Sequence, residues 1–250
     1  MTIRTAIAGA ALIAGVLTPT RSALCQPHGG DGFLFGAPAA TITLHGGLAR
    51  PNEGSDIFSF VRNQLTLNRG DFTGGSYGAD ISFVVAPRWA VQVGFATSGQ
   101  TVPTNYRDYV DNARAEITQS STLRRTPLSA GVRYYLTPTG RSLGSLAWVP
   151  SRMTAYASAG VGITWYRFKQ WGDFVDYQTM DVFPATLNSS GNTASQYAAL
   201  GAEYTLSPSF ALNVETRYDH ARGTPGASFS GFDKIDLSGM AFSMGLSVRY

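Results

Sequence analysis

The chain has 250 residues, with 19 basic residues against 16 acidic ones and a formal charge of +3. Only 14% of its residues are charged, well below the roughly 25% of soluble domains. This composition provides no basic footprint for nucleic acid, so we expect no nucleic-acid partner.

Residues 1–25 are predicted to be a signal peptide. Arg4 precedes an apolar run at 6–17, which is too short to cross a membrane as a helix. Cleavage after Cys25 removes Arg4 and Arg21, so 17 basic residues remain against 16 acidic ones, and the charge falls to +1. No cysteine would then remain, which excludes disulfides and cysteine-ligated metal. The alternative, a lipid on Cys25, is disfavoured by the bulky Leu24 before it.

Residues 26–37 are rich in glycine and predict a flexible lead-in. Apolar and polar residues then alternate in eight runs, at about 38–49, 75–86, 89–99, 123–137, 153–169, 194–206, 210–221 and 240–250. Side chains alternate between the two faces of a strand, so each run predicts a strand with one apolar face and one small or polar face. For 38–250 we predict an all-β fold, an eight-stranded antiparallel up-and-down barrel.

Alternation alone does not distinguish a soluble, lipocalin-like barrel from a transmembrane one. Three observations favour the membrane. The polar faces are rich in Gly, Ala and Ser, as a narrow lumen requires. Short turns at 86–88 and 207–209 alternate with four long external loops, predicted at 50–74, 100–122, 170–193 and 222–236. Aromatic residues lie near strand ends, as at a membrane interface: Trp89, Trp165, Tyr204, Tyr218 and Tyr250. In the remaining connection, 138–152, we expect Trp148 against the membrane edge.

The last run has a continuous apolar face that ends in an aromatic residue: Phe242, Met244, Leu246, Val248 and Tyr250. With this signal, the strand count and the pattern over 38–250, the chain resembles the eight-stranded outer-membrane barrels of Gram-negative bacteria, the superfamily of the OmpA transmembrane domain, OmpX and OmpW. The resemblance implies a monomer in the outer membrane with both termini in the periplasm. Its partners would be membrane lipids, lipopolysaccharide and the barrel-insertion machinery, which reads the C-terminal signal.

Six charged residues fall on the predicted lumen faces, with His45 nearby in register: Asp80, Arg133, Glu203, Glu215, Arg217 and Asp219. Charges in a lumen too narrow for bulk water must be paired. We therefore expect a polar network, either a structural plug or a gate that opens when partners exchange. Asp80, Glu215 and Arg217 are expected in the middle layer, with Arg133 and Glu203 nearer the periplasm.

One stretch is similar to the outer-membrane lipid A deacylases, in which an Arg-Tyr-x-His-x-Ser segment places a histidine beside a nucleophilic serine. Here Arg217, Tyr218 and His220 match, but Arg222 occupies the serine position. A base without a nucleophile cannot transfer an acyl group. We therefore predict no enzyme activity, no catalytic residue, no metal site and no cofactor.

Three functions compete at this stage. The preferred one is a non-enzymatic structural or surface-interaction role through the external loops. The first alternative is a small OmpW-like channel for ions or small solutes. The second is a lipid A-modifying enzyme, which the missing serine disfavours.

Overall fold

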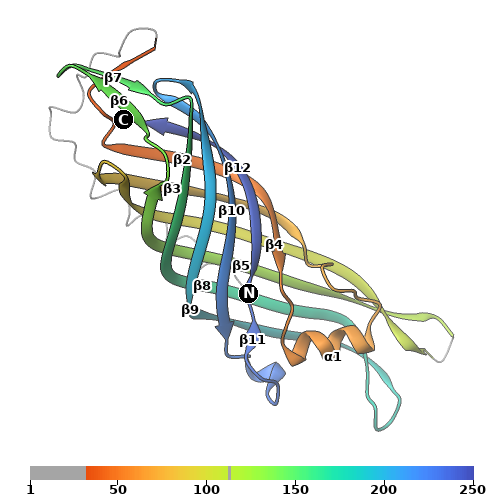
Figure 1. Ribbon diagram of the computed structural model, residues 1–250. Helices are drawn as coiled ribbons and strands as arrows, with labels where there is room; N and C mark the ends of the chain where they lie inside the picture. Colours follow the sequence, from red (N-terminus) through yellow and green to blue (C-terminus); the bar gives the residue numbers. More distant parts are fainter. Residues whose placement is uncertain (1–31, 112–113) are drawn as a thin grey trace, which may run out of the picture.

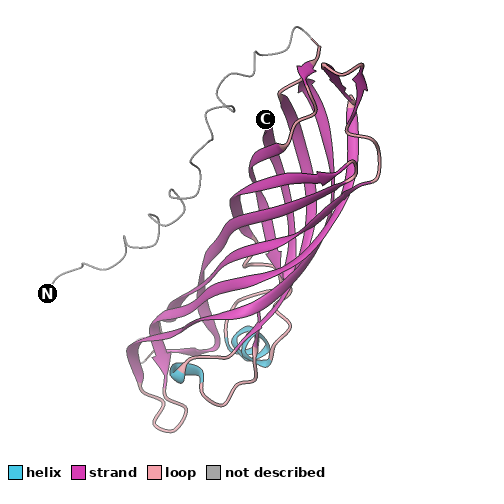
Figure 2. Ribbon diagram, turned by 90° about the vertical axis from the view of Figure 1, so that its left-hand side faces the viewer, coloured by secondary structure: helices cyan, strands magenta, loops and turns pink. Residues whose placement is uncertain are grey.

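Eight long antiparallel strands form a closed barrel in the computed structural model (Figures 1 and 2). The structure describes residues 32–111 and 114–250, so the expected signal peptide lies outside it. The barrel strands are β2 (Ala40–Pro51), β3 (Gly74–Ala86), β4 (Trp89–Val110), β5 (Glu116–Tyr135), β8 (Met153–Val175), β9 (Val182–Ser207), β10 (Phe210–Gly223) and β12 (Gly239–Arg249). Each pairs with the next, and β12 pairs with β2 to close the ring.

Smaller elements lie at the two ends of the barrel. At the end that holds Tyr250, here the C-terminal end, β1 (Leu34–Phe35), β6 (Gly140–Leu143) and β7 (Ala147–Pro150) form a three-stranded sheet (Figure 1). At the other end, here the helix end, lie α1 (Asp56–Gln64), the short helix η2 (Ala227–Phe229) and β11 (Ile235–Asp236). No helix among the described residues has the length and apolar character needed to span a membrane.

The apolar faces of the strands point outward, as predicted for a transmembrane barrel. Large apolar side chains form an exposed band around the wall, among them Leu44, Leu48, Tyr77, Val93, Phe95, Val161, Leu200 and Met244. Small and polar side chains such as Thr43, Ser82, Ser129, Ser158 and Ser247 are buried inside. Water on the outer wall would make this distribution unfavourable, whereas lipid favours it. The prediction of an eight-stranded antiparallel transmembrane barrel is confirmed.

Two of the predicted external loops, 100–122 and 170–193, are largely strand. β4 continues to Val110 and β5 starts at Glu116, while β8 and β9 are separated only by residues 176–181. Beyond the membrane band the polarity of the wall inverts. In β8 the outward series Val161, Ile163, Trp165 gives way to exposed Arg167 and half-buried Lys169, while Tyr166 and Phe168 are buried inside. The predicted strands end at this inversion, because they were defined by an apolar outward face. The backbone pairing of the real strands continues beyond it.

The predicted position of Trp148 at the membrane edge is wrong. Trp148 is almost fully buried in β7, opposite Leu34 of β1, and packs over Gly140. The end of the segment predicted as a flexible lead-in is thus part of a sheet. With Tyr135, Glu203 and Arg249, Trp148 lines a cavity of about 300 Å³ at the C-terminal end of the barrel.

Candidate functional site: the lumen and its closures

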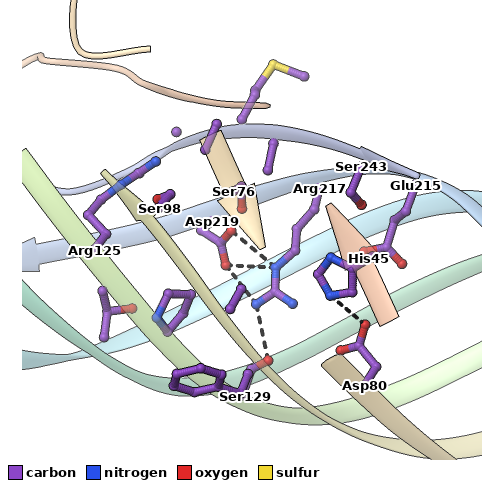
Figure 3. Close-up of a pocket in the computed structure, with 18 of the residues that line it drawn as sticks. His45, Ser76, Asp80, Ser98, Arg125, Ser129, Glu215, Arg217, Asp219 and Ser243 are labelled. Atoms are coloured by element: carbon purple, nitrogen blue, oxygen red, sulfur yellow. Dashed lines mark hydrogen bonds and ion pairs between the residues drawn. The ribbon is translucent and has the colours of Figure 1, made fainter. Parts of the chain in front are cut away.

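The centre of the lumen holds a small polar cavity of about 50 Å³, shown in Figure 3. A cavity of this size has room for only a few water molecules. Arg217 reaches across it from β10 and donates to the Asp219 carboxylate (Nη2–Oδ1 2.8 Å) and to Ser129 Oγ on β5 (3.2 Å). On the opposite wall, His45 Nε2 of β2 lies 3.1 Å from Asp80 Oδ2 of β3. The lumen therefore narrows to paired side chains at its middle.

Arg133 on β5 is the hub of a second cluster, nearer the C-terminal end. Its side chain is 1% exposed. Its Nη1 donates to Glu203 Oε1 at 3.0 Å, its Nε donates to Gln92 Oε1 at 3.0 Å, and its guanidinium stacks 3.9 Å from the centre of the Tyr156 ring. Tyr156 in turn donates to Glu215 Oε2 at 2.9 Å. A buried guanidinium with this many partners has little freedom to move.

All six predicted lumen charges lie inside the barrel, in two adjacent groups. Asp80, Glu215 and Arg217 line the central cavity. Arg133 and Glu203 lie nearer the C-terminal end, and Nη2 of Arg133 is 3.9 Å from Glu215 Oε2, so the two groups are in contact.

Arg249 also belongs to the network, although it was not among the predicted lumen residues. Its Nη2 lies 3.2 Å from Glu203 Oε2, so Glu203 is shared by two arginines. The position of Arg249 on the polar face of the last strand could have predicted that its side chain points into the lumen. Four buried or half-buried arginines, Arg125, Arg133, Arg217 and Arg249, thus match in number the four lumen carboxylates Asp80, Glu203, Glu215 and Asp219.

The helix end is closed by an apolar core, which we call the cap. It joins α1 and the segment 65–72 to residues 221–237 and to the inner face of the extended wall. Ile57, Phe58 and Val61 form the buried face of α1, and Phe58 packs edge-on against Phe168 of β8 with ring centres 5.5 Å apart. Neither α1 nor this core was predicted, because 50–74 was interpreted as a loop.

Polar contacts hold the first segment of the cap in place. Glu53 is completely buried and its carboxylate accepts a hydrogen bond from Gly70 N (3.1 Å), with Arg62 Nη1 3.6 Å away. Burial raises the pKa of Glu53 above its usual value, although the bond from Gly70 and the charge of Arg62 oppose this. Arg107 of β4 donates to the carbonyl oxygens of Leu65 (2.6 Å) and Leu67 (3.3 Å).

His220 does have a serine beside it, although not at position 222. Ser238 Oγ lies 3.1 Å from His220 Nδ1. Ser238 is only 2% exposed, however, and its hydroxyl also accepts from Ala221 N (3.2 Å). A nucleophile must be reachable by substrate and free to turn toward it. Ser238 and His220 are thus as close as the two residues of a serine–histidine dyad, but the hydroxyl is not accessible to a substrate. The contact holds residues 221 and 238 together.

The outer wall carries two further features. The apolar side chains of the C-terminal signal point outward, with Phe242, Met244, Leu246 and Tyr250 exposed on β12 and its end. Above the membrane band, Arg124 of β5 and Arg167 of β8 are directly opposed in the sheet, and both are exposed. With Trp165 and Asn192 they line an open depression of about 520 Å³.

Similarity to known proteins is confined to solved structures, at low sequence identity. No protein-family model matches the sequence, and no curated protein matches it. Among solved structures, the chain is similar to OprG of Pseudomonas aeruginosa (16% identity, TM-score 0.49) over 86% of its own length and 98% of that chain. It is also similar to the Neisserial surface protein NspA (13% identity, TM-score 0.48), over 86% of its own length and 99% of that chain. A major outer-membrane protein of Thermus thermophilus matches at 12% identity and TM-score 0.47, over 85% of this chain and 100% of that chain.

Proposed function

We propose that this protein is a non-enzymatic surface-interaction barrel of the outer membrane, whose lumen is closed and whose helix end contacts its partners. The observation that carries this proposal is the double closure of the lumen. Arg133, Glu203 and Arg249 fill it toward the C-terminal end, and the apolar core of the cap fills it at the helix end. A continuous water path would have to break both buried ion pairs and apolar packing.

The proposal places the helix end outside the cell and both termini in the periplasm. Short turns at β3–β4 and β9–β10 lie at the C-terminal end, while the extended hairpins β4–β5 and β8–β9 lie at the helix end (Figure 1). Outer-membrane barrels have short periplasmic turns and longer external connections. We further propose that the protein works as a monomer, because the ring is complete within one chain.

Planar-bilayer recording separates this role from the channel alternative. The purified protein is expected to show no conductance steps, because the lumen has no open path. A variant in which Arg133 and Glu203 are both replaced by Ala is also expected to stay silent, because the cap remains in place. Steady conductance of the unmodified protein would favour the channel and overturn the closed-barrel proposal.

We propose lipopolysaccharide as one partner, held through the arginine pair Arg124–Arg167. Like charges directly opposed across two strands destabilise a sheet, and neither guanidinium has an ion-pair partner among the described residues. A phosphate between them would relieve the repulsion by charge-assisted hydrogen bonds. The depression begins at Trp165, where the apolar band ends, which is the height of lipid headgroups.

This partner is tested by thermal unfolding in vesicles that contain either phosphorylated or dephosphorylated lipid A. The phosphorylated lipid is expected to raise the Tm of the unmodified protein by a few degrees. Replacement of Arg124 and Arg167 by Gln should remove this increase, whereas Arg141→Gln at the C-terminal end should keep it. An equal Tm in both vesicles would contradict a phosphate site at this pair.

A further inference from the structure

The cap contains a cavity of its own, separate from the lumen. It has a volume of about 180 Å³ and lies between α1, the hairpins β4–β5 and β8–β9, and η2. Its walls are mainly apolar, with Ile57, Val61, Phe174, Leu187 and Phe229 among the lining residues. None of the lining residues carries a charge. The cavity can therefore accept only an uncharged, largely apolar occupant.

One of the side chains that line this cavity has a polar atom without a partner. Gln119 of β5 is 5% exposed, and its Oε1 is buried without a hydrogen-bond partner among the described residues. The other long polar side chains in the lining are already engaged. Gln170 Nε2 donates to Ser121 Oγ at 3.1 Å, and the hydroxyl of Tyr177 donates to Gln64 Oε1 at 2.9 Å. A buried acceptor without a donor is unfavourable, so Gln119 marks the place where a donor is missing.

The size of the cavity restricts what can supply this donor. Drug-sized ligands occupy pockets of roughly 300 Å³ or more, whereas an apolar cavity of about 150 Å³ accepts one benzene ring. The aromatic side chains of Phe60, Tyr177 and Phe183, each about half exposed, lie where the cavity opens to the surface. The opening is therefore apolar, as an apolar ligand requires.

We propose that the cap binds a small uncharged aromatic molecule with one hydroxyl or N–H donor, which hydrogen-bonds to Gln119 Oε1. The ring occupies the apolar part of the cavity between α1 and β8–β9, and the donor supplies the partner that Gln119 lacks. This inference rests on the proposed surface-binding role and gives it a ligand class. It needs no passage through the lumen.

The test compares two probes of almost equal shape, 4-fluorophenol and 4-fluorotoluene, by fluorine NMR titration of the barrel in nanodiscs. Only the phenol carries a donor. It is expected to bind roughly three- to tenfold more tightly than the toluene, the usual effect of one net hydrogen bond. Empty nanodiscs correct for partition of the probes into lipid.

Three variants assign the binding to the cavity. Gln119→Leu keeps the side chain's size and removes the acceptor, so it should abolish the preference for the phenol. Leu187→Trp fills the cavity and should abolish binding of both probes, while Gln178→Leu, on the turn outside the cavity, should change neither. Gln119→Met, whose thioether is only a weak acceptor, serves as a second variant if Gln119→Leu does not assemble.

Two results would overturn the inference: equal binding of both probes by the unmodified protein, or a preference that survives the loss of the Gln119 acceptor. Neither result affects bilayer conductance. A conducting barrel that keeps the Gln119-dependent preference would instead overturn the closed lumen alone. The two proposals therefore fail in distinguishable ways.

Discussion

Arg133 Nη1 and Glu203 Oε1 lie 3.0 Å apart inside the barrel, and both side chains are almost fully buried. They come from β5 and β9, which are separated in the ring by β8, so their contact crosses the inner face of that strand. Glu203 also pairs with Arg249 of β12. One carboxylate thereby links three strands from different parts of the wall.

The substitution Glu203→Gln should destabilise the barrel strongly. It leaves Arg249 without its carboxylate partner and Arg133 with only the more distant Glu215, and breaking a buried pair in this way costs about 3–5 kcal/mol. The free energy of unfolding can be followed in urea by the shift in gel mobility between folded and unfolded barrel. The double variant with Arg133→Gln should lose less than the sum of the two single losses. Strict additivity would show that the two residues are not coupled.

Gly201→Ala tests the packing beneath this pair. A Cβ on Gly201 would lie 2.3 Å from Cζ and Oη of Tyr156, whose ring stacks on Arg133. The ring must shift, and overpacking of this kind costs about 1–3 kcal/mol. Gly46→Ala is the matched control, because its Cβ would meet Tyr77 at 3.4 Å, an ordinary contact. Equal unfolding free energies for the two variants would show that Tyr156 is free to move.

Acidity should affect the first segment of the cap through Glu53. The folded-state pKa of this carboxyl is raised by burial, so the folded state binds its proton more tightly than the unfolded state does. Its contribution to stability is full below the unfolded value of 4.5 and is lost as the pH rises through the folded pKa. Amide exchange of residues 54–72 should therefore become faster, beyond its intrinsic pH dependence, as the pH rises from 4.5 through the folded-state pKa of Glu53.

Glu53→Gln provides the control for this pH dependence. The amide cannot ionise, so exchange of the segment in this variant should follow only the intrinsic pH dependence of amide exchange. Asp108→Asn, which changes a carboxyl outside the cap core, should retain the behaviour of the unmodified protein. If the pH dependence persisted in Glu53→Gln, another group would be responsible.

Tyr250 is predicted to matter for assembly. Its backbone is bonded to β2 and to the residue before it, with Tyr250 N donating to Ala40 O at 2.9 Å and Ala39 N donating to Tyr250 O at 2.7 Å. Deletion removes these bonds as well as the aromatic ring, so insertion into the outer membrane should fall. Tyr250→Ser keeps the backbone and isolates the ring, with Met240→Ser as an exposed control on the same strand. Normal outer-membrane levels of both Tyr250 variants would contradict an insertion signal.

The sequence predicts the barrel well where lipid and lumen impose opposite polarity on the two faces of a strand. Ile81 and Asp80, or Val132 and Arg133, are adjacent in the chain and point to opposite sides. That rule stops at Trp165, where water replaces lipid outside and apolar packing replaces polar pairing inside. The extended hairpins were therefore interpreted as loops, although their strand propensity was present in residues such as Thr101 and Thr122, whose hydroxyls lie 2.7 Å apart.

The features missed in the candidate site depend on distance in space. The residues near His220 in the chain do not predict its contact with Ser238, because this contact forms only when residues 224–238 fold back on β10. The cavity beside Gln119 is likewise formed by segments from five parts of the chain. The alternation of apolar and polar residues assigns Gln119 to one face of a strand. It does not predict which residues surround the side chain, or that its oxygen has no hydrogen-bond partner.

The cap also stabilises the pairing of the first and last strands of the barrel. Its first segment follows β2 and its last segment precedes β12, and these two strands form the seam where the beginning and end of the chain meet. Asp56 Oδ2 accepts from Asp233 N (2.9 Å), and Asp236 Oδ2 accepts from Gly54 N (3.1 Å), so the two segments are clasped to each other directly above the seam. We expect these two hydrogen bonds to form only after β12 has paired with β2, and then to oppose the separation of the two strands. A protease cut between Gly54 and Asp56 would therefore loosen the barrel at the strand pair that completed it.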